Sequence, residues 1–450
     1  MKKKWFLFSI IFLVVIILIF RALLKDSSYD PEKQFTIKQL QQDFLKTRKI
    51  LENNHPALYY FHGKETLDQY FDNVYALIDS SMSVKYFYIL LSRIAAKANC
   101  GHTYLELPKG YWKSAHKIYK YFPFKLYFQD GKAYVLKNYS QDTAIPLGAE
   151  ILSINDTPTS QIIINFLETI YSDGLNQTYK YAKMNRIDYG LFPGYAEFPN
   201  YYDLTYVTRE DTVARCTIVE ALTHGEIAEA QKKLFPENWE YVPFKFKMID
   251  SLSTAILIVK DFIGYSNKEF QQFLANAFES IHQKGIQNLI IDVRNNDGGD
   301  PPNATAILSY LTDIPFIYFP PHVLGYWSLK KPIDPHPLKF KGNAYILIDG
   351  GCFSTTGHFI SMIKYHNLGI LIGEESGGSY ICNGCVENYT LPNTKIILNC
   401  ARCVYRTNVH GFTRERGIMP DIEVKPKIED LIENRDTVME FVLKMERWQT

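Results

Sequence analysis

The chain has 450 residues, of which 46% are hydrophobic, and a formal net charge of +1 from 49 basic and 48 acidic side chains. This length allows two or three domains with sizeable cores, and the hydrophobic content excludes a largely disordered protein. The charge is balanced and no basic stripe is interleaved with aromatic residues, which argues against nucleic acid as a partner.

Residues 1–25 differ in kind from the rest of the chain. Lys2 to Lys4 precede an uncharged, mostly apolar run from Trp5 to Phe20. No small-x-small cleavage site follows, so the pattern favours an uncleaved signal anchor in the membrane over a removed signal peptide. The lysines would then stay in the cytoplasm, and the remaining chain is expected on the extracytoplasmic face, periplasmic or at the cell surface.

Residues 34–108 are predicted to form a helical cap. Thr36 and Gln39 have the spacing of a capping box, and three runs of apolar residues at helical spacing follow. The third run stops at the segment Cys100-Gly101-His102-Thr103, before a short predicted strand at 104–107. His102 therefore lies at a helix-to-strand junction, where a lone histidine is more often structural than catalytic.

Residues 116–243 change to short strands and turns, for example at 122–128, 133–136 and 145–155, followed by a helical pattern. This order is similar to part of a PDZ domain, in which a strand edge and a helix bind an extended peptide. A plain β-rich insertion is the alternative. Glu220 to Trp239 is interpreted as a surface excursion.

Residues 244–450 are predicted to form an α/β core. A strand at 254–259, a helix from Asn267 and a strand at 288–294 make a crossover unit, which implies a parallel sheet. That last strand breaks into glycines, and a later strand at 344–348 leads into a helix through Ser354. A serine at such a corner faces the crevice where α/β folds bind ligands. A helix over 428–448 is expected to dock on this core.

Four separated motifs agree with one family. They are Cys100-Gly101-His102-Thr103; Leu289-Ile-Ile-Asp292-Val-Arg294-Asn-Asn-Asp-Gly298-Gly299; Phe353-Ser354-Thr355-Thr356 with Ile372 to Gly378 behind it; and Glu415-Arg-Gly417-Ile-Met-Pro420-Asp421-Ile-Glu-Val424. From about residue 35 to its end, the chain resembles the C-terminal-processing, or tail-specific, serine peptidases, whose relatives include the tricorn core protease and the interphotoreceptor retinoid-binding protein. The resemblance implies a crotonase-like peptidase core.

The resemblance also implies roles for individual residues. Ser354 would be the nucleophile, His102 its base and Glu415 the carboxylate that orients the histidine. Serine needs such a base, and histidine can take its proton near neutral pH. Backbone amides would stabilise the oxyanion, each contributing about 3 kcal/mol. We expect these donors at Gly298 or Gly299 and at Thr355.

Two positions depart from patterns within the family. The branch that uses a serine and lysine pair would place lysine near position 379, where Ser379 stands, so the chain is similar to the histidine-using branch. Some members of that branch have serine immediately before the histidine, and here that residue is Gly101. The resemblance therefore implies no fourth catalytic member at this position.

Structural interpretations compete with these roles. Ser354 could be a helix N-cap, which serine favours. Glu415, which lies between two arginines, could be a solvated surface charge. Asp292 and Arg294 could simply pair to support the loop that follows them. We weigh the catalytic interpretation above the structural one for Ser354, His102 and Glu415.

Seven cysteines are present, and four of them form two C-x-x-C pairs, Cys382 with Cys385 and Cys400 with Cys403. This spacing is typical of a structural zinc site. If the intervening residues form a hairpin, Cys382 would face Cys403 and Cys385 would face Cys400, which allows two disulfides in an exported chain. Both interpretations are structural and both stay open. Cys352 is interpreted as a packing residue.

The sequence as a whole predicts a membrane-anchored, extracytoplasmic serine endopeptidase that cleaves protein or peptide substrates. Catalysis by this set of residues requires no cofactor. The alternative is a catalytically silent binding protein for apolar or peptide ligands on the same scaffold, as the retinoid-binding relatives suggest. Fold alone does not decide between them.

Overall fold

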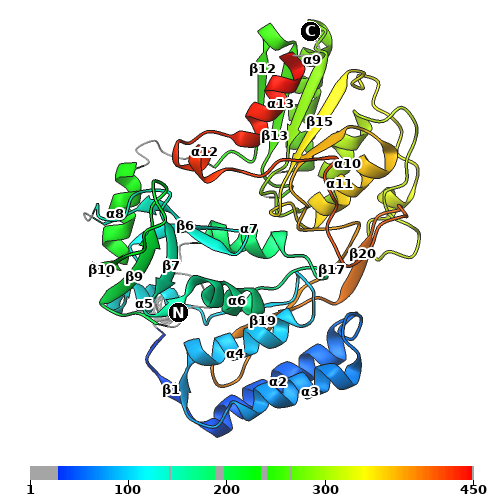
Figure 1. The fold of residues 1–450 in the computed structure, drawn as a ribbon. Helices are drawn as coiled ribbons and strands as arrows, with labels where there is room; N and C mark the ends of the chain where they lie inside the picture. Colours follow the sequence, from blue (N-terminus) through cyan, green and yellow to red (C-terminus); the bar gives the residue numbers. More distant parts are fainter. Residues whose placement is uncertain (1–28, 141–142, 188–196, 235–240, 264–265, 448–450) are drawn as a thin grey trace, which may run out of the picture.

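The structure, a computed structural model, describes residues 29–140, 143–187, 197–234, 241–263 and 266–447. The predicted signal anchor at 1–25 lies outside these residues. Of the helices in the described ranges, none has the length and apolar character that a membrane span needs. Figure 1 shows a helical region in blue, a β-rich region in cyan and green, and a larger α/β region from green through yellow to red.

The N-terminal region is built from three helices, and the capping box predicted at its start is confirmed. The Thr36 hydroxyl accepts the Gln39 amide, and the Gln39 side chain accepts the Thr36 amide. The helices are α2 (Ile37–Asn54), α3 (Lys64–Ala76) and α4 (Val84–Ala96), with a small ladder of β1 (Gln34–Phe35) and β2 (Met82–Ser83). Their apolar faces share one buried cluster, in which Phe44, Phe71 and Phe87 are fully enclosed.

A short strand joins this cap to the C-terminal part of the chain. β3 (Tyr104–Glu106) pairs antiparallel with β19 (Ile397–Cys400), which pairs with β18 (Glu387–Thr390). Buried Asp43 of α2 accepts hydrogen bonds from the Thr394 amide and hydroxyl in the β18–β19 turn. The segment that carries His102, just before β3, is thereby held against residues almost 300 positions later in the chain.

The middle region is an antiparallel sheet with helices beside it. Its strand order is β10-β9-β7-β6-β5, with β8 on β7. The strands are β5 (Phe124–Gln129), β6 (Lys132–Asn138), β7 (Glu150–Ile154), β8 (Thr157–Pro158), β9 (Tyr201–Val207) and β10 (Arg215–Glu220). The helices are α5 (Tyr111–Ile118), α6 (Thr159–Thr169), α7 (Thr178–Arg186) and α8 (His224–Leu234), and β4 (Lys120–Tyr121) pairs with β11 (Leu222–Thr223).

The stretch from Glu220, interpreted as a surface excursion, contains helix α8 at His224–Leu234, most of whose residues are exposed, while 235–239 lie outside the described residues. Thr223 and Glu226 cap this helix reciprocally, each side chain accepting the other's amide. Ile227 is buried against Tyr121 and Tyr139. Because only one residue of α8 is buried, its apolar residues do not recur at helical spacing. The sequence pattern therefore did not predict the helix.

The core is a six-stranded sheet with the order β12-β13-β14-β15-β16-β21. The strands are β12 (Phe244–Ile249), β13 (Thr254–Val259), β14 (Asn288–Asp292), β15 (Asn343–Ile348), β16 (Ile370–Gly373) and β21 (Ile422–Glu423). The predicted crossover is confirmed: β13 and β14 are parallel, and so are all later pairs, while β12 is antiparallel. β14 is buried along its whole length because helices cover both faces of the sheet.

The core helices are α9 (Asn267–Lys284), α10 (Pro301–Ser309), α11 (Thr355–His366), α12 (Ile428–Ile432) and α13 (Thr437–Arg447), with short 3₁₀ turns at Asp250–Leu252 and Trp327–Lys330. Helices α9 to α11 lie on one face of the sheet, and α13 covers the other. The single helix expected over 428–448 is therefore two helices, interrupted at Asn434, which has a positive φ of 56°.

Candidate active site

Ser354 lies at the corner between β15 and α11, as the sequence predicts. Its backbone has φ 55° and ψ −122°, a conformation that a non-glycine residue rarely adopts and that costs energy to hold. Ser354 is the N-cap residue of α11, yet its side chain makes no capping hydrogen bond. The N-cap interpretation therefore does not account for this serine, whose hydroxyl is turned elsewhere.

The hydroxyl of Ser354 is turned toward His102. The Ser354 Oγ and His102 Nε2 atoms lie 3.1 Å apart, although 252 positions separate the residues. Burial lowers the pKa of His102 to about 4; nearby Lys183 lowers it further and Asp297 acts in the opposite direction. At neutral pH the imidazole is therefore uncharged and can accept the serine proton.

Packing against Phe353 explains the glycine that precedes His102. The rings of His102 and Phe353 are in contact at a tilt of 31°, with centroids 4.8 Å apart. A Cβ atom at Gly101 would lie 2.3 Å from Phe353 Cζ, so no side chain fits here unless that ring moves. A serine at this position would therefore require the Phe353 ring to shift.

Glu415, the predicted third member, is not brought to the histidine. It lies in an exposed stretch, and its backbone carbonyl accepts the Leu175 amide at 2.8 Å. The His102 Nδ1 atom is buried and finds no hydrogen-bond partner within the residues that the structure describes. The role of Glu415 stays a prediction.

Two of the three predicted oxyanion donors remain available. Gly298 donates its amide to Asn296 Oδ1 at 2.8 Å, while the amides of Gly299 and Thr355 have no acceptor in the described part of the chain. Gly298 nevertheless shapes the corner: with φ at +102°, a Cβ atom there would lie 2.8 Å from the Ser354 Cβ. Its missing side chain lets the two loops touch.

Asp292 and Arg294 support the loop beneath this corner. The Arg294 guanidinium donates to both carboxylate oxygens of Asp292 at 2.9 Å and to those of Asp436, next to α13, at 2.7 Å. Although burial opposes it, pairing with Arg294 lowers the pKa of Asp292. These contacts support the structural interpretation of this pair, and neither residue touches Ser354.

A cavity of about 160 Å³ opens beside Ser354 and His102. Its walls include Phe319, Tyr326 and Tyr405. His358 and Cys382 also line it, with 3.5 Å between His358 Nε2 and Cys382 Sγ. His358 was not predicted from the sequence, and Cys382 was predicted only as a structural cysteine. His358 lies one helical turn after Ser354, a spacing that could have drawn attention to it.

Cys382 and Cys385 line this cavity, but the two cysteine pairs do not lie in the predicted register. In the two-stranded ribbon of β17 (Ile381–Gly384) and β20 (Cys403–Arg406), Cys382 is opposite Tyr405 and Cys403 is opposite Gly384. Cys400 is opposite Glu387 in another sheet. The register required for the two predicted disulfides is therefore wrong. All seven cysteines are free thiols, and no group of three or more metal-binding side chains occurs among the described residues.

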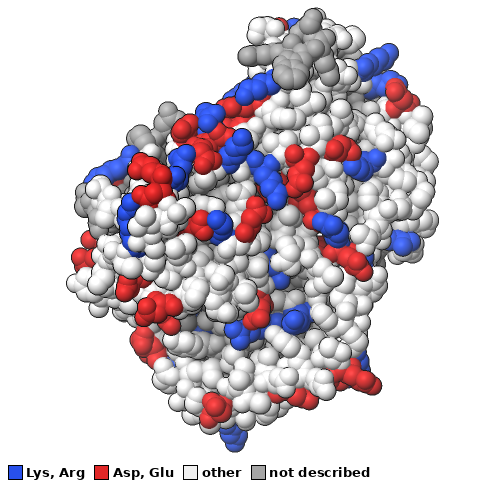
Figure 2. Space-filling model, in the orientation of Figure 1, with Lys and Arg blue, Asp and Glu red and all other residues white. Residues whose placement is uncertain are grey.

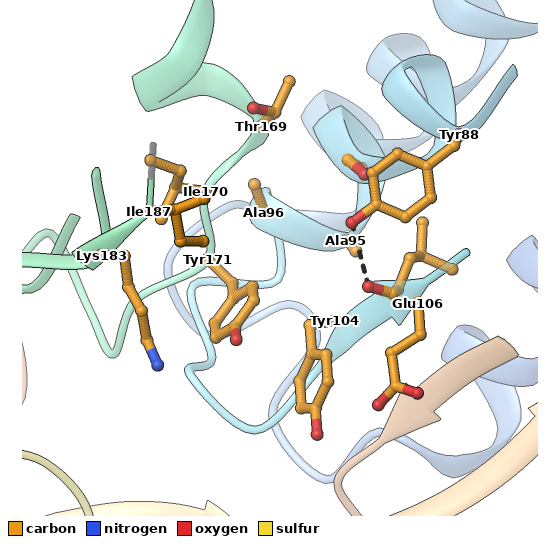
Figure 3. A pocket seen from close by; sticks show the side chains of 12 residues that line it. Tyr88, Ala95, Ala96, Tyr104, Glu106, Thr169, Ile170, Tyr171, Lys183 and Ile187 are labelled. Atoms are coloured by element: carbon orange, nitrogen blue, oxygen red, sulfur yellow. Dashed lines mark hydrogen bonds between the residues drawn. The ribbon is translucent and has the colours of Figure 1, made fainter. Parts of the chain in front are cut away.

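A second cavity, of about 180 Å³, lies between the cap and the middle region. Figure 3 shows the rings of Tyr88, Tyr104 and Tyr171 around it, with Lys183 at its rim. The Tyr88 hydroxyl donates to the Leu105 carbonyl at 3.0 Å, so this carbonyl of β3 faces the cavity rather than β19. In an antiparallel ladder the amide of the same residue points the same way. The free edge of β3 therefore faces the cavity.

Charges on the visible face of the molecule are mixed. Figure 2 shows Lys and Arg side chains interspersed with Asp and Glu, without a continuous basic area on this face. Among the described residues, charges of opposite sign also form ion pairs, for example Arg48 with Asp68 and Arg416 with Glu375. This face offers no electrostatic footprint for a polyanion.

Comparisons with known proteins agree on one family and one fold. The sequence model of peptidase family S41 matches residues 253–424. The structure is similar to mature CPAF, with 15% identity, a TM-score of 0.64 and coverage of 91% of this chain and 96% of that chain. For mature CPAF complexed with lactacystin the values are 15%, 0.65, 92% and 98%. No curated protein matches the sequence. At such identities, the structural similarity establishes a shared mixed α/β fold.

Proposed function

Residues 253–424 belong to peptidase family S41, a family of serine peptidases and hence of hydrolases, and from this premise we propose that the chain is a serine endopeptidase that uses Ser354 and His102. The observation that carries the proposal is the 3.1 Å contact between Ser354 Oγ and His102 Nε2. It joins a strained corner of the core to a loop of the cap.

The proposed reaction uses groups already in place. His102 takes the proton of Ser354 as the hydroxyl attacks the peptide carbonyl, and then delivers it to the leaving amine. The amides of Gly299 and Thr355 donate to the oxyanion, each contributing about 3 kcal/mol. Water then hydrolyses the acyl-enzyme by the reverse sequence of proton transfers. These steps need no metal or organic cofactor.

An extended peptide is the substrate that suits the cavities. We infer a crotonase-like core with a PDZ-like middle region, in which the peptide lies beside the edge strand β3. The aromatic cavity beside Tyr104 and Tyr171 would take a large apolar side chain of that peptide. The cavity with Phe319 and Tyr405, next to Ser354, would take another.

Location is proposed from the N-terminal sequence alone. Residues 1–25 would anchor the protein in the membrane and leave the peptidase on the extracytoplasmic face, where exported proteins are its substrates. Protease digestion of intact cells would test this: a tag at the C-terminus should be degraded from outside, and its full protection would contradict the proposal.

Covalent labelling by a fluorophosphonate tests the activity. We expect the wild-type protein to be labelled and Ser354→Ala to lose labelling entirely while its thermal unfolding midpoint is unchanged. Ser328→Ala, which alters an exposed serine, should be labelled normally. A wild-type protein that is never labelled between pH 5 and 9 would instead favour a binding protein on this scaffold.

A further inference from the structure

The ribbon of β17 and β20 forms part of the wall of the cavity beside Ser354, and it is a sheet of these two strands alone. Cys403 of β20 is opposite Gly384 of β17, and Cys385 follows Gly384 directly. Opposite Cα atoms in an antiparallel pair lie about 4.5–5.5 Å apart, and one residue adds about 3.4 Å along the strand. The Cα atoms of Cys385 and Cys403 are therefore roughly 6 Å apart, within the range of about 4.4–6.8 Å that a disulfide needs.

The side chains of Cys385 and Cys403 lie on the same face of the ribbon. Cys403 and Tyr405 are two residues apart on β20, so their side chains share one face. Cys385 has a left-handed φ of 51°, and its Sγ atom lies 3.0 Å from the Tyr405 hydroxyl. A Cβ atom at Gly384 would lie 2.9 Å from the Tyr405 ring, so the glycine gives that ring room to reach Cys385. The thiols of Cys385 and Cys403 contact each other directly.

These two thiols are also the accessible members of the C-x-x-C motifs. Cys385 is exposed and Cys403 is half-buried, whereas Cys382 and Cys400 are buried. Each disulfide predicted from the sequence would need one buried thiol, and the pair of Cys385 and Cys403 needs none. Of the remaining cysteines only Cys216 is exposed, and it lies on β10 of the middle region.

We propose that Cys385 and Cys403 are a disulfide-forming pair that closes the ribbon of β17 and β20 and fixes this wall of the cavity beside Ser354. The inference goes beyond the proposed peptidase activity, and it requires an external disulfide as the oxidant. In the cell, the source of that oxidant would be the extracytoplasmic compartment proposed above, where protein disulfides form and persist.

The exchange proceeds in two balanced steps. The Cys385 thiolate attacks one sulfur of the external disulfide, whose S–S bond breaks, and one thiolate leaves while a mixed disulfide forms on Cys385. The Cys403 thiolate then attacks the Cys385 sulfur, forms the new S–S bond and releases the second thiolate. The two protons that the cysteines lose end on the two released thiols, so the external disulfide is reduced as the pair is oxidised.

The order of these steps follows from the surroundings of the two thiols. Burial and the contact with Cys385 raise the pKa of the Cys403 thiol. The thiolate is the attacking species, so a thiol with a raised pKa reacts slowly with a reagent in solution. Cys385, the exposed thiol, therefore starts the exchange.

The disulfide would close the loop of residues 386–402 at its base. This loop contains β18 and β19, and β19 pairs with β3, the strand that follows His102. A cross-link removes open conformations of the loop that it closes. The backbone amides of residues 381–406 should therefore open less often and exchange their hydrogens with solvent more slowly.

The experiment compares the full-length wild-type protein with Cys385→Ser, Cys403→Ser and Cys216→Ser. Each protein is reduced with dithiothreitol, freed of it and incubated with oxidised glutathione at about pH 8.5, where exposed thiols are partly ionised. The remaining thiols are alkylated, and peptide mapping by mass spectrometry identifies the bonded residues. Hydrogen exchange of residues 381–406 is measured before and after oxidation. Cys216→Ser is the matched control, because it removes an exposed thiol outside the ribbon.

We expect the wild-type protein and Cys216→Ser to form the bond between Cys385 and Cys403, and dithiothreitol to reverse it. Hydrogen exchange of residues 381–406 should slow by about tenfold in these oxidised proteins. Cys403→Ser should stop at the mixed disulfide of Cys385 with glutathione, without a change in hydrogen exchange. Cys385→Ser should form no disulfide between Cys403 and another cysteine.

Two results would overturn the inference. One is a wild-type protein that stays reduced, carries only glutathione on Cys385, or bonds either thiol to another cysteine. The other is a bond between Cys385 and Cys403 that leaves the hydrogen exchange of residues 381–406 unchanged, because the wall would then be no more fixed than before. Neither measurement uses peptidase activity, so a wild-type protein without fluorophosphonate labelling would contradict the proposed function alone.

Discussion

The two halves of the candidate site are held by different kinds of structure. Ser354 stands on a parallel sheet whose central strands β14 and β15 are buried almost completely between helices. His102 stands on a helical cap whose interior contains charged groups, among them Asp43 and Lys85. The apolar strands beneath the nucleophile vary little with pH, and the loop that follows them is supported by the ion pair of Asp292 and Arg294. The cap, by contrast, buries the Lys85 ammonium without a partner among the described residues, and its protonation changes near pH 7. The histidine half should therefore loosen first.

The most severe test of the core half is Gly298→Ala. The added Cβ would lie 2.7 Å from the Phe353 carbonyl and 2.8 Å from the Thr355 nitrogen, both of them backbone atoms that cannot move separately from Ser354. We expect fluorophosphonate labelling to fall by more than about 10³-fold as the corner and its oxyanion donor are displaced.

Gly131→Ala is the matched control for Gly298→Ala. Gly131 also has a positive φ, +79°, but an added Cβ would meet nothing within 4 Å. The Gly131→Ala variant should lose only the free energy of the backbone strain, roughly 1–2 kcal/mol, and should be labelled at the wild-type rate. Equal losses in the two variants would show that strain, not the close approach of the loops, is what matters.

The cap half is tested by Lys85→Met. The Lys85 ammonium is fully buried, has no hydrogen-bond partner among the described residues and lies 4.7 Å from the Trp112 ring. Burial lowers its pKa to about 7. Between pH 7 and the ordinary lysine range the unfolded chain binds the extra proton, so the free energy of unfolding of the wild-type protein should rise with pH over that interval, by about 1.4 kcal/mol per unit.

Methionine at position 85 should remove this slope and stabilise the cap below pH 7 by several kcal/mol, as measured by urea unfolding at pH 6 and pH 9. Lys46→Met, which alters an exposed lysine of α2, should keep the wild-type slope. Lys85→Met with an unchanged slope would show that the buried ammonium is not what makes the cap sensitive to pH.

The same contrast explains what could be predicted from the sequence. The corner at Ser354, the glycines at 298 and 299 and the crossover from β13 to β14 depend on short contiguous stretches, whose apolar runs and turns are visible locally. The position of His102 followed from a helix end and a family motif. These are the parts of the site in which backbone conformation is set by neighbouring residues.

What could not be predicted depends on how distant segments dock. The register of β17 against β20, which form a two-stranded sheet, does not follow from the spacing of the cysteines, so the predicted facing of Cys382 and Cys403 failed. Asp173 lies in a loop without a motif and acquires its place only when that loop meets Asn99 and Gly101. Helix α8, by contrast, had a readable signal in its capping box.

The mildest test concerns the boundary between the two halves, where the substrate is proposed to lie. Tyr104, two residues after His102, stacks on Tyr171 with ring centroids 4.8 Å apart and lines the cavity of Figure 3. Tyr104→Ala removes an apolar wall without touching either reacting group. We expect KM to rise about three- to tenfold for peptides with a large apolar residue there, with kcat unchanged, because uniform binding is lost.

A positional alanine scan of a cleaved peptide would identify that residue, and its alanine analogue should show the same KM with wild-type and variant enzymes. Tyr201→Ala, which alters an exposed tyrosine on β9, is the control. If Tyr104→Ala lowers kcat instead, the Tyr104 ring acts on His102 through the backbone that joins the two residues. The cavity would then support the catalytic histidine and not bind the substrate.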